Sequence, residues 1–171
     1  MGVCYPCVVS RAADLNQLDE LLLRFVRAVR RPSYLNRILQ GASGIPGAQA
    51  LRVLRSVELR EQRGERTSIR DVAADLEIEQ STASRAVNAI VDLELVSRST
   101  DPSDQRRTLL SLTPEGHAAL TLASRNRMSV IAEVSARWTA AEIQLFTRML
   151  EQLVVQYETV DAPDAGLHLH A

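Results

Sequence analysis

The chain has 171 residues and a formal net charge of −1, with 46% hydrophobic and 24% charged residues. This composition excludes disorder over the whole chain, and the charge alone does not indicate nucleic-acid binding. All 20 basic residues are arginines, whose planar guanidinium groups suit phosphate and guanine contacts. No apolar run reaches the roughly 18 residues of a membrane span, and no signal-peptide pattern begins the chain. We therefore expect a cytoplasmic protein without membrane, metal or cofactor.

The two cysteines, Cys4 and Cys7, lie within residues 1–13, which we expect to form a flexible arm. Their C-x-x-C spacing is that of dithiol redox motifs and of half a zinc site. No second cysteine pair follows, and an isolated motif is a weak signal, so incidental thiols are the favoured interpretation. Redox or metal sensing through this pair stays open as an alternative. At the other end, residues 159–171 are expected to be disordered.

An apolar stripe at helical spacing predicts a first helix that begins near Asp14. Its members are Leu15, Leu18, Leu22, Phe25 and Val29. Pro32 should interrupt this helix, because its ring clashes with the preceding turn. A second helix is predicted over residues 33–40. A third opens near Pro46, which suits a first-turn position where no amide donor is needed.

Two short amphipathic patterns, separated by a tight polar turn, predict a helix-turn-helix between residues 68 and 93. Ser68 can cap the first helix together with Asp71, and residues 77–79 form the turn. The second helix exposes side chains that can read bases in a major groove or bind phosphate. These are Gln80, Ser81, Thr82, Ser84, Arg85 and Asn88. Taken alone, an ordinary helix with a solvated polar face is the better interpretation, because such faces are common.

Two β-prone runs, residues 95–98 and 108–112, predict a hairpin around an Asp-Pro-Ser-Asp turn sequence. Arg106 and Arg107 lie where a hairpin could present them to a narrow minor groove, and Arg98 lies on the opposite run. Without its neighbours, a solvated surface hairpin would be preferred.

The motifs together resemble the MarR family of bacterial winged-helix regulators. The resemblance rests on D-V-A-A-D-L, Q-S-T-A-S-R, L-V-S-R and D-P-S-D-Q-R-R-T-L-L-S-L-T-P-E-G, with D-x-R-x5-L-T from Asp104 to Thr113 as the most specific element. It covers about residues 14–157. It implies a mainly α fold with a small β-hairpin wing, a recognition helix over residues 80–88 and Arg106 as the wing-tip arginine. Asp104 would hold Arg106 in place.

Glu77 and Glu94 depart from the family, which usually has glycine at these positions. If the backbone there keeps a positive φ, each glutamate costs about 1 kcal/mol. The predicted DNA-binding segment is also not basic, because residues 79–112 contain four arginines and five acidic residues. Further phosphate contacts would come from Arg63, Arg66 and Arg70, and binding should depend steeply on salt.

The remaining helices predict a second region. Thr113 and Pro114 start a helix to about residue 136, and Thr139 and Glu142 form a capping box for the last one. The last helix carries an apolar stripe of Ile143, Phe146, Leu150, Leu153 and Tyr157. The apolar helix faces within residues 14–45 and 114–158 are too large for the winged lobe over residues 46–113 to bury. The resemblance implies that they form a homodimer with recognition helices roughly 34 Å apart.

The predicted function is a sequence-specific DNA-binding regulator, a homodimeric repressor on a pseudo-palindromic operator that responds to a small-molecule effector. Two alternatives keep the fold: a regulator that senses redox state or metal through Cys4 and Cys7, and a winged helix used only for protein contacts. An enzyme is disfavoured, because His117, His168 and His170 are poorly placed, and neither a phosphate loop nor a nucleophile–base pair is evident.

Overall fold

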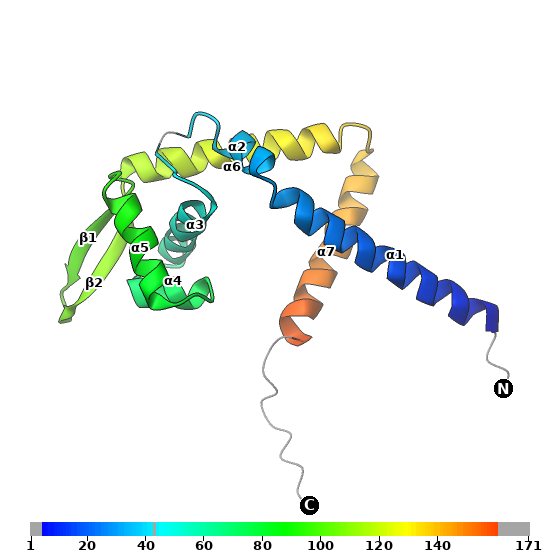
Figure 1. Ribbon diagram of the computed structural model, residues 1–171, viewed down its shortest axis with the longest axis horizontal. Helices are drawn as coiled ribbons and strands as arrows, with labels where there is room; N and C mark the ends of the chain where they lie inside the picture. Colours follow the sequence, from blue (N-terminus) through cyan, green and yellow to red (C-terminus); the bar gives the residue numbers. More distant parts are fainter. Residues whose placement is uncertain (1–4, 43, 161–171) are drawn as a thin grey trace, which may run out of the picture. The chain divides into compact units, whose positions relative to one another are not determined.

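The computed structural model describes residues 5–42 and 44–160, and Cys4 and the expected tail beyond residue 160 lie outside them. The chain forms two compact units, residues 1–128 and 129–171, which are described separately. Figure 1 shows the order of the helices and strands. None of the helices in the described ranges is long and apolar enough to cross a membrane.

The first unit contains five complete helices and one hairpin among its described residues. In chain order these are α1 (Tyr5–Val29), α2 (Pro32–Leu39), α3 (Ala48–Gln62), α4 (Ile69–Asp75), α5 (Gln80–Val91), β1 (Val96–Asp101) and β2 (Asp104–Leu112). Helix α6 (Pro114–Val134) starts in this unit and ends in the second, where α7 (Ala140–Val160) follows.

Three helix starts differ from, or sharpen, the sequence prediction. Helix α1 begins at Tyr5 rather than Asp14, so the segment expected to be a flexible arm is helical from Tyr5 onward. Pro32 occupies the first turn of α2, where its missing amide costs nothing. The first-turn prediction for Pro46 is wrong, because Gly47 is the N-cap of α3 and Pro46 precedes it.

The core of the first unit lies where α3, α4, α5 and the hairpin meet. Its fully buried side chains include Val53, Leu54 and Val57 of α3, Val72 of α4, Ala83, Val87 and Ile90 of α5, and Val96 of β1. On α3 and α5 these positions recur at helical spacing, so one face of each helix points inward while the other stays polar. Ile38 of α2 and three residues of α6, Ala119, Leu120 and Ala123, belong to the same apolar core.

The hairpin is longer than predicted. Its strands pair from Val96 opposite Leu112 to Asp101 opposite Asp104, with a register irregularity after Thr100. The connection is therefore shorter than the predicted loop over residues 99–107. A backbone bridge from the amide of Leu110 to the carbonyl of Thr67, at 2.8 Å, joins the base of the hairpin to the chain before α4.

The start of α6 is fixed against the hairpin by a cap and a glycine. The Thr113 hydroxyl accepts from the amide of Gly116 at 3.0 Å, as predicted for a capping threonine. A Cβ on Gly116 would lie 2.1 Å from the carbonyl oxygen of Leu95, so only glycine allows this close approach. The T-P-E-G sequence thus sets where α6 begins.

The second unit consists of the end of α6, a short turn and α7. The predicted capping box is confirmed: the Glu142 carboxylate accepts from the amide of Thr139 at 2.7 Å and the Thr139 hydroxyl accepts from the amide of Glu142 at 3.3 Å. These backbone and side-chain hydrogen bonds from Thr139 lower the pKa of Glu142. Trp138 and Phe146 pack edge to face, with ring centroids 5.3 Å apart.

Candidate nucleic-acid interface

Helix α4 begins with the capping box that the sequence predicts. The Asp71 carboxylate accepts from the amide of Ser68 at 2.8 Å, and the Ser68 hydroxyl accepts from the amide of Asp71 at 3.4 Å. Aspartate replaces the usual glutamate without loss of either contact. This cap fixes the chain just ahead of the helix-turn-helix.

Both glutamates that stand in place of glycine have left-handed backbones. Glu77 has φ of 52° and Glu94 has φ of 57°. After Glu77 the amide of Ile78 donates to the carbonyl of Ala73 at 3.0 Å, and after Glu94 the amide of Leu95 donates to that of Ile90 at 2.9 Å. These contacts satisfy helix-end carbonyls, as in a glycine C-cap. The turns therefore keep their geometry, and the residues carry the strain.

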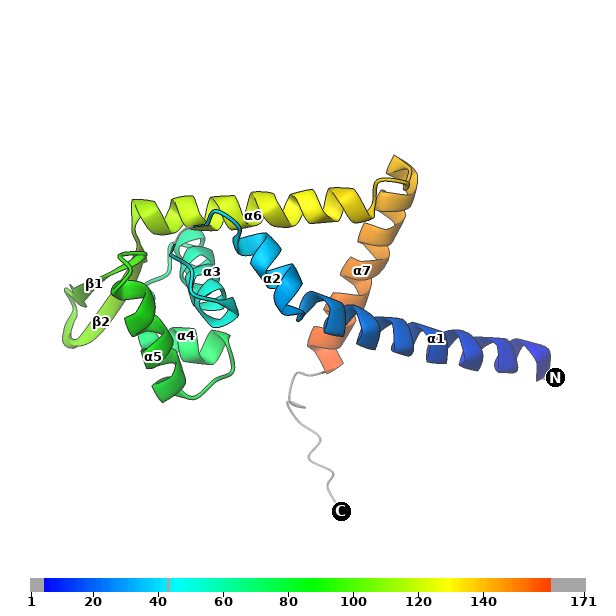
Figure 2. The same cartoon turned by 45° about the horizontal axis from the view of Figure 1, so that its top comes forward.

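Helix α5 presents its predicted polar face to solvent. Gln80, Ser81, Arg85 and Asn88 are exposed, while Thr82 and Ser84 are half-buried. Figure 2 shows α5 beside the hairpin. This exposed face suits insertion into a major groove.

Asn88 and Arg98 form a pair. The Arg98 guanidinium donates to the side-chain oxygen of Asn88, linking α5 to β1. Since a guanidinium only donates, this contact orients the amide with its nitrogen away from Arg98. Both residues were predicted as separate DNA contacts, but the structure brings them together as one unit.

The hairpin turn is organised by a buried aspartate that the sequence analysis took only as turn chemistry. The Asp101 side chain is 2% exposed and accepts from the amide and the hydroxyl of Ser103, at 2.9 and 2.6 Å. Hydrogen bonds from Ser103, together with the nearby charges of Arg66 and Arg107, lower the pKa of Asp101. An aspartate two residues before a serine is an Asx-turn signal, but its burial depends on the pairing of the strands.

Asp104 contacts Arg106 through the backbone amide of Arg106. A carboxylate oxygen of Asp104 accepts from the backbone amide of Arg106 at 3.0 Å. Asp104 thus holds the backbone at Arg106, whereas the guanidinium forms no ion pair with any residue that the structure describes. Arg106 is exposed at the wing.

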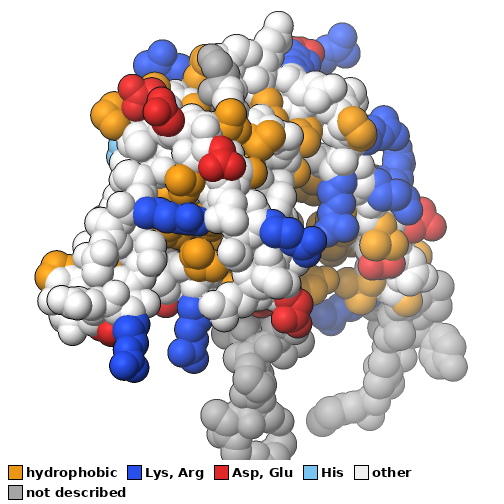
Figure 3. Space-filling model, turned by 60° about the vertical axis from the view of Figure 1, so that its left-hand side comes forward, with side chains coloured by type: hydrophobic (Ala, Val, Ile, Leu, Met, Phe, Trp, Pro, Cys, Tyr) orange, Lys and Arg blue, Asp and Glu red, His pale blue; other side chains and the backbone are white. Residues whose placement is uncertain are grey.

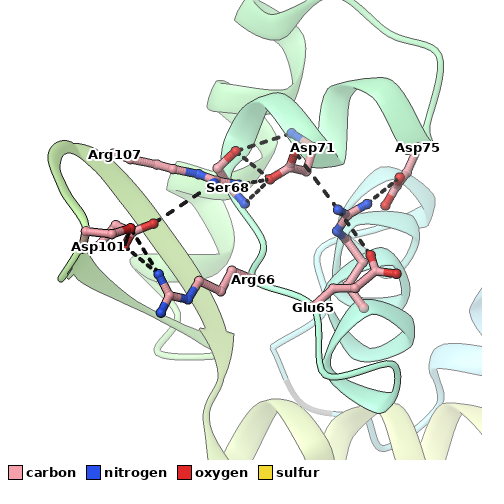
Figure 4. Close-up of polar contacts among 9 residues, drawn as sticks. Glu65, Arg66, Ser68, Asp71, Asp75, Asp101 and Arg107 are labelled. Atoms are coloured by element: carbon pink, nitrogen blue, oxygen red, sulfur yellow. Dashed lines mark hydrogen bonds and ion pairs between the residues drawn. The ribbon is translucent and has the colours of Figure 1, made fainter.

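A second predicted contact, Arg107, points toward the lobe. Its Nη2 lies 2.9 Å from Asp71 Oδ2 and its Nη1 lies 3.9 Å from Asp101 Oδ2. Arg66, proposed from sequence as a phosphate contact, donates to Asp101 at 2.7 Å. Figure 4 shows Asp101 between the two guanidinium groups and Asp71 on the α4 side. These two arginines are engaged with acids of the protein.

Asp71 is the point where the cap and the hairpin meet. Partial burial by itself raises the pKa of Asp71, but hydrogen bonds from Ser68 and Arg107 and the charge of Arg60 lower it overall. Arg60 in turn lies 3.0 Å from Asp75 and 3.2 Å from Glu65. Ion pairs thus link α3, α4 and the hairpin.

A groove of about 730 Å³ separates α4 and the start of α5 from the hairpin. Its lining includes Arg70, Gln80 and Arg106, and also Ser68, Ile69, Asp71, Asp104, Arg107 and Thr108. Arg70, like Arg106, is exposed and makes no ion pair within the described ranges. The groove thus brings together Arg70 of α4, Gln80 of α5 and Arg106 of the hairpin, each of which was predicted to contact DNA.

The surface around this groove carries separate positive charges. Viewed from the side of the hairpin and α5, basic side chains project singly from a mostly uncharged surface in Figure 3. This agrees with the sequence between residues 79 and 112, where acids outnumber arginines.

The sequence is similar to those of known winged-helix regulators. Residues 47–116 match the family described as a winged helix DNA-binding domain. An uncharacterized HTH-type transcriptional regulator of Bacillus subtilis, YxaD, is 27% identical over 85 residues, which are 50% of this chain and 59% of YxaD. The chain spans between half and three-fifths of the length of the curated relatives it matches.

Two solved structures show the wider similarity. The MarR family transcription regulator SP03579 matches with a TM-score of 0.71 at 17% identity, over 90% of this chain and 97% of its own. BpsR of Bordetella bronchiseptica, whose DNA binding is regulated by 6-hydroxynicotinic acid, matches with a TM-score of 0.55 at 25% identity, over 81% of this chain and 98% of its own. The matches confirm the predicted fold and the resemblance to the MarR family.

Proposed function

We propose that this chain, a winged-helix protein of the MarR type, is a transcriptional regulator that binds a pseudo-palindromic DNA operator. The observation that carries the proposal is that Gln80 at the start of α5 and Arg106 on the wing line the same groove. A recognition helix and a wing arginine on one rigid lobe can contact a major groove and the adjacent minor groove together.

The exposed face of α5 supports a division of roles. Arg85 can reach guanine O6 and N7, and Gln80 can pair with adenine. The Thr82 methyl can meet a thymine methyl, while Ser81 and Ser84 are short enough for phosphate contact. Side-chain chemistry supports these roles, and Gln80, Ser81 and Arg85 are also exposed on α5.

The terminal helices support a homodimer. Within the single chain, α1 exposes apolar side chains such as Phe25 at 64%, and α7 exposes Phe146 at 51% and Tyr157 at 62%. Such continuous apolar faces favour burial against a second copy. A two-fold axis would then place two α5 helices on successive turns of one face of DNA, roughly 34 Å apart.

Effector control is the third part of the proposal, supported by the similarity to BpsR. We propose that the dimer has two arrangements that differ in the spacing of the recognition helices. A small molecule can shift the balance between them only if it binds the two with different affinities. Thermal shift with a panel of aromatic acids that includes 6-hydroxynicotinic acid tests this step. At least one member should raise the melting temperature and change the affinity for DNA.

Selection from a random pool of duplex DNA tests the whole proposal. We expect a palindromic consensus, since two copies of one lobe read the two half-sites. The double variant Arg85→Ala, Arg106→Ala should lose specific binding, while Arg24→Ala, Arg27→Ala removes the same charge from α1 and should keep it. A pool without enrichment would instead favour a winged helix that serves protein contacts.

A further inference from the structure

The wing carries two consecutive arginines in different environments. Arg106 is exposed and lines the groove, and its guanidinium makes no ion pair in the described part of the chain. Arg107 is half-buried and reaches Asp71 on α4 at 2.9 Å and Asp101 on β1 at 3.9 Å. The resemblance assigns the wing-tip role to Arg106 alone, and the ion pairs of Arg107 with the protein now give that residue a different role.

We infer that Arg107 is a positioning residue that braces the wing against α4 and leaves the DNA contact of the wing to Arg106, the arginine for which the resemblance implies that role. The brace consists of Asp71, Asp101, Arg66 and Arg107 (Figure 4). This inference rests on the proposed function and assigns the parts of its wing.

The hairpin end of the brace depends on a buried carboxylate. Asp101 is 2% exposed, and its partners are Ser103, Arg66 and Arg107. A buried carboxylate that loses a cationic partner keeps the cost of its desolvation. Turning Arg107 outward to a phosphate would therefore weaken the structure that shapes the wing.

The lobe end of the brace is equally fixed. Asp71 belongs to the capping box of α4, and the neighbouring Val72 is fully buried in the core. Arg107 therefore joins the wing to a helix that cannot shift without disturbing the helix-turn-helix. The result is a set distance between Arg106 and α5 before DNA arrives, which lowers the ordering cost of binding.

The brace makes a prediction opposite in sign to simple electrostatics. Removing an acid near DNA should tighten binding, because repulsion of the phosphates falls. Removing Asp101 should weaken binding instead, because the wing loses its support. The slope of log Kd against log salt separates the two arginines, since each neutralised phosphate contributes about 0.9 to it.

The experiment measures affinity by fluorescence anisotropy on the duplex selected by the full wild-type chain, between about 50 and 200 mM salt. The variants are Arg106→Gln, Arg107→Gln and Asp101→Asn. Asp92→Asn is the matched control, because Asp92 is exposed in the same unit and its side chain makes no hydrogen bond or ion pair with a described residue. Circular dichroism confirms that each variant is folded at the assay temperature.

We expect Arg106→Gln to lower the salt slope by about one, and Arg107→Gln to weaken binding roughly fivefold with the slope unchanged. Asp101→Asn should also weaken binding, while Asp92→Asn leaves it unchanged or tighter. Arg107→Lys should restore part of the loss, because lysine can still pair with Asp71.

Two results would overturn the brace alone, provided that the wild-type chain binds specifically. One is a salt slope lowered by about one in Arg107→Gln, and the other is tighter binding by Asp101→Asn. A wild-type chain that selects no sequence overturns the proposed function and the inference built on it.

Discussion

The winged lobe and the terminal helices bury their apolar side chains to very different extents. In the lobe, Leu54, Val57 and Ile90 are completely inaccessible within a single chain. On the terminal helices, Phe25 of α1 and Met149 of α7 are 64% and 60% exposed. Hydrophobic burial is the main favourable term in folding, so the lobe is stabilised by a core buried within one chain. The terminal helices leave apolar side chains exposed, and burying them against a partner surface would stabilise these helices.

The largest effect should come from a charge placed on the exposed face of α7. We expect Leu150→Asp to abolish the dimer, since a two-fold interface buries the unpaired carboxylate twice, at about 3–5 kcal/mol each. Light scattering coupled to size-exclusion chromatography measures the mass. Gln152→Asp introduces the same charge two residues away and should stay dimeric. A monomeric parent, or a dimer that survives Leu150→Asp, would contradict the proposed interface.

A core truncation in the lobe should cost less, but should act within one chain. Leu54→Ala removes a fully buried side chain from α3 and should lower the free energy of unfolding by about 2–5 kcal/mol. Leu59→Ala, on the same helix and 37% exposed, should cost about 1 kcal/mol. Urea unfolding at a fixed protein concentration measures both. Equal losses would show that the lobe core is not the main source of its stability.

Acid should weaken the lobe through Asp71. The pKa of Asp71 is lowered in the folded state, so its carboxylate stabilises the fold above the unfolded pKa of about 3.9. That contribution disappears as the pH falls through the folded value. Asp71→Asn should therefore lower the melting temperature by about 2–4 °C from pH 5 to pH 7, the size of a lost cap.

The pH dependence of this difference is the decisive observation. The gap between parent and Asp71→Asn should shrink below about pH 4, where the parent also loses the charge. The Asp92→Asn variant serves as the control and should follow the parent at every pH. A gap that stays constant down to pH 3 would show that the carboxylate charge of Asp71 does not matter.

Local signals explain what the sequence could predict. The Ser68 and Thr139 caps and the inward face of α5 each depend on residues close in the chain. The positive φ of Glu77 and Glu94 was expected only from the glycines that the family has at these positions. Periodicity and capping chemistry act over about one helical turn, so a single sequence contains them.

Long-range pairing explains what the sequence missed. The contact of Arg107 with Asp71 joins residues 36 positions apart, and the contact of Arg66 with Asp101 joins residues 35 apart. The D-x-R-x5-L-T element singles out Arg106, but nothing in the sequence shows that Arg107 pairs with Asp71. The start of α1 could also have been found, because Tyr5, Val8 and Ala12 continue the helical spacing of Leu15 and Leu18 toward the N-terminus.

The smallest expected effect tests the strain stored in the turn before α5. Glu77 holds φ at 52°, a backbone that glycine adopts without the penalty of a Cβ. We expect Glu77→Gly to raise the free energy of unfolding by about 1 kcal/mol, seen as a higher melting temperature. Ala74→Gly, at an exposed position inside α4, is the matched control and should lower it by about the same amount. If both glycines destabilise the lobe, the Glu77 side chain must contribute more than its backbone strain costs.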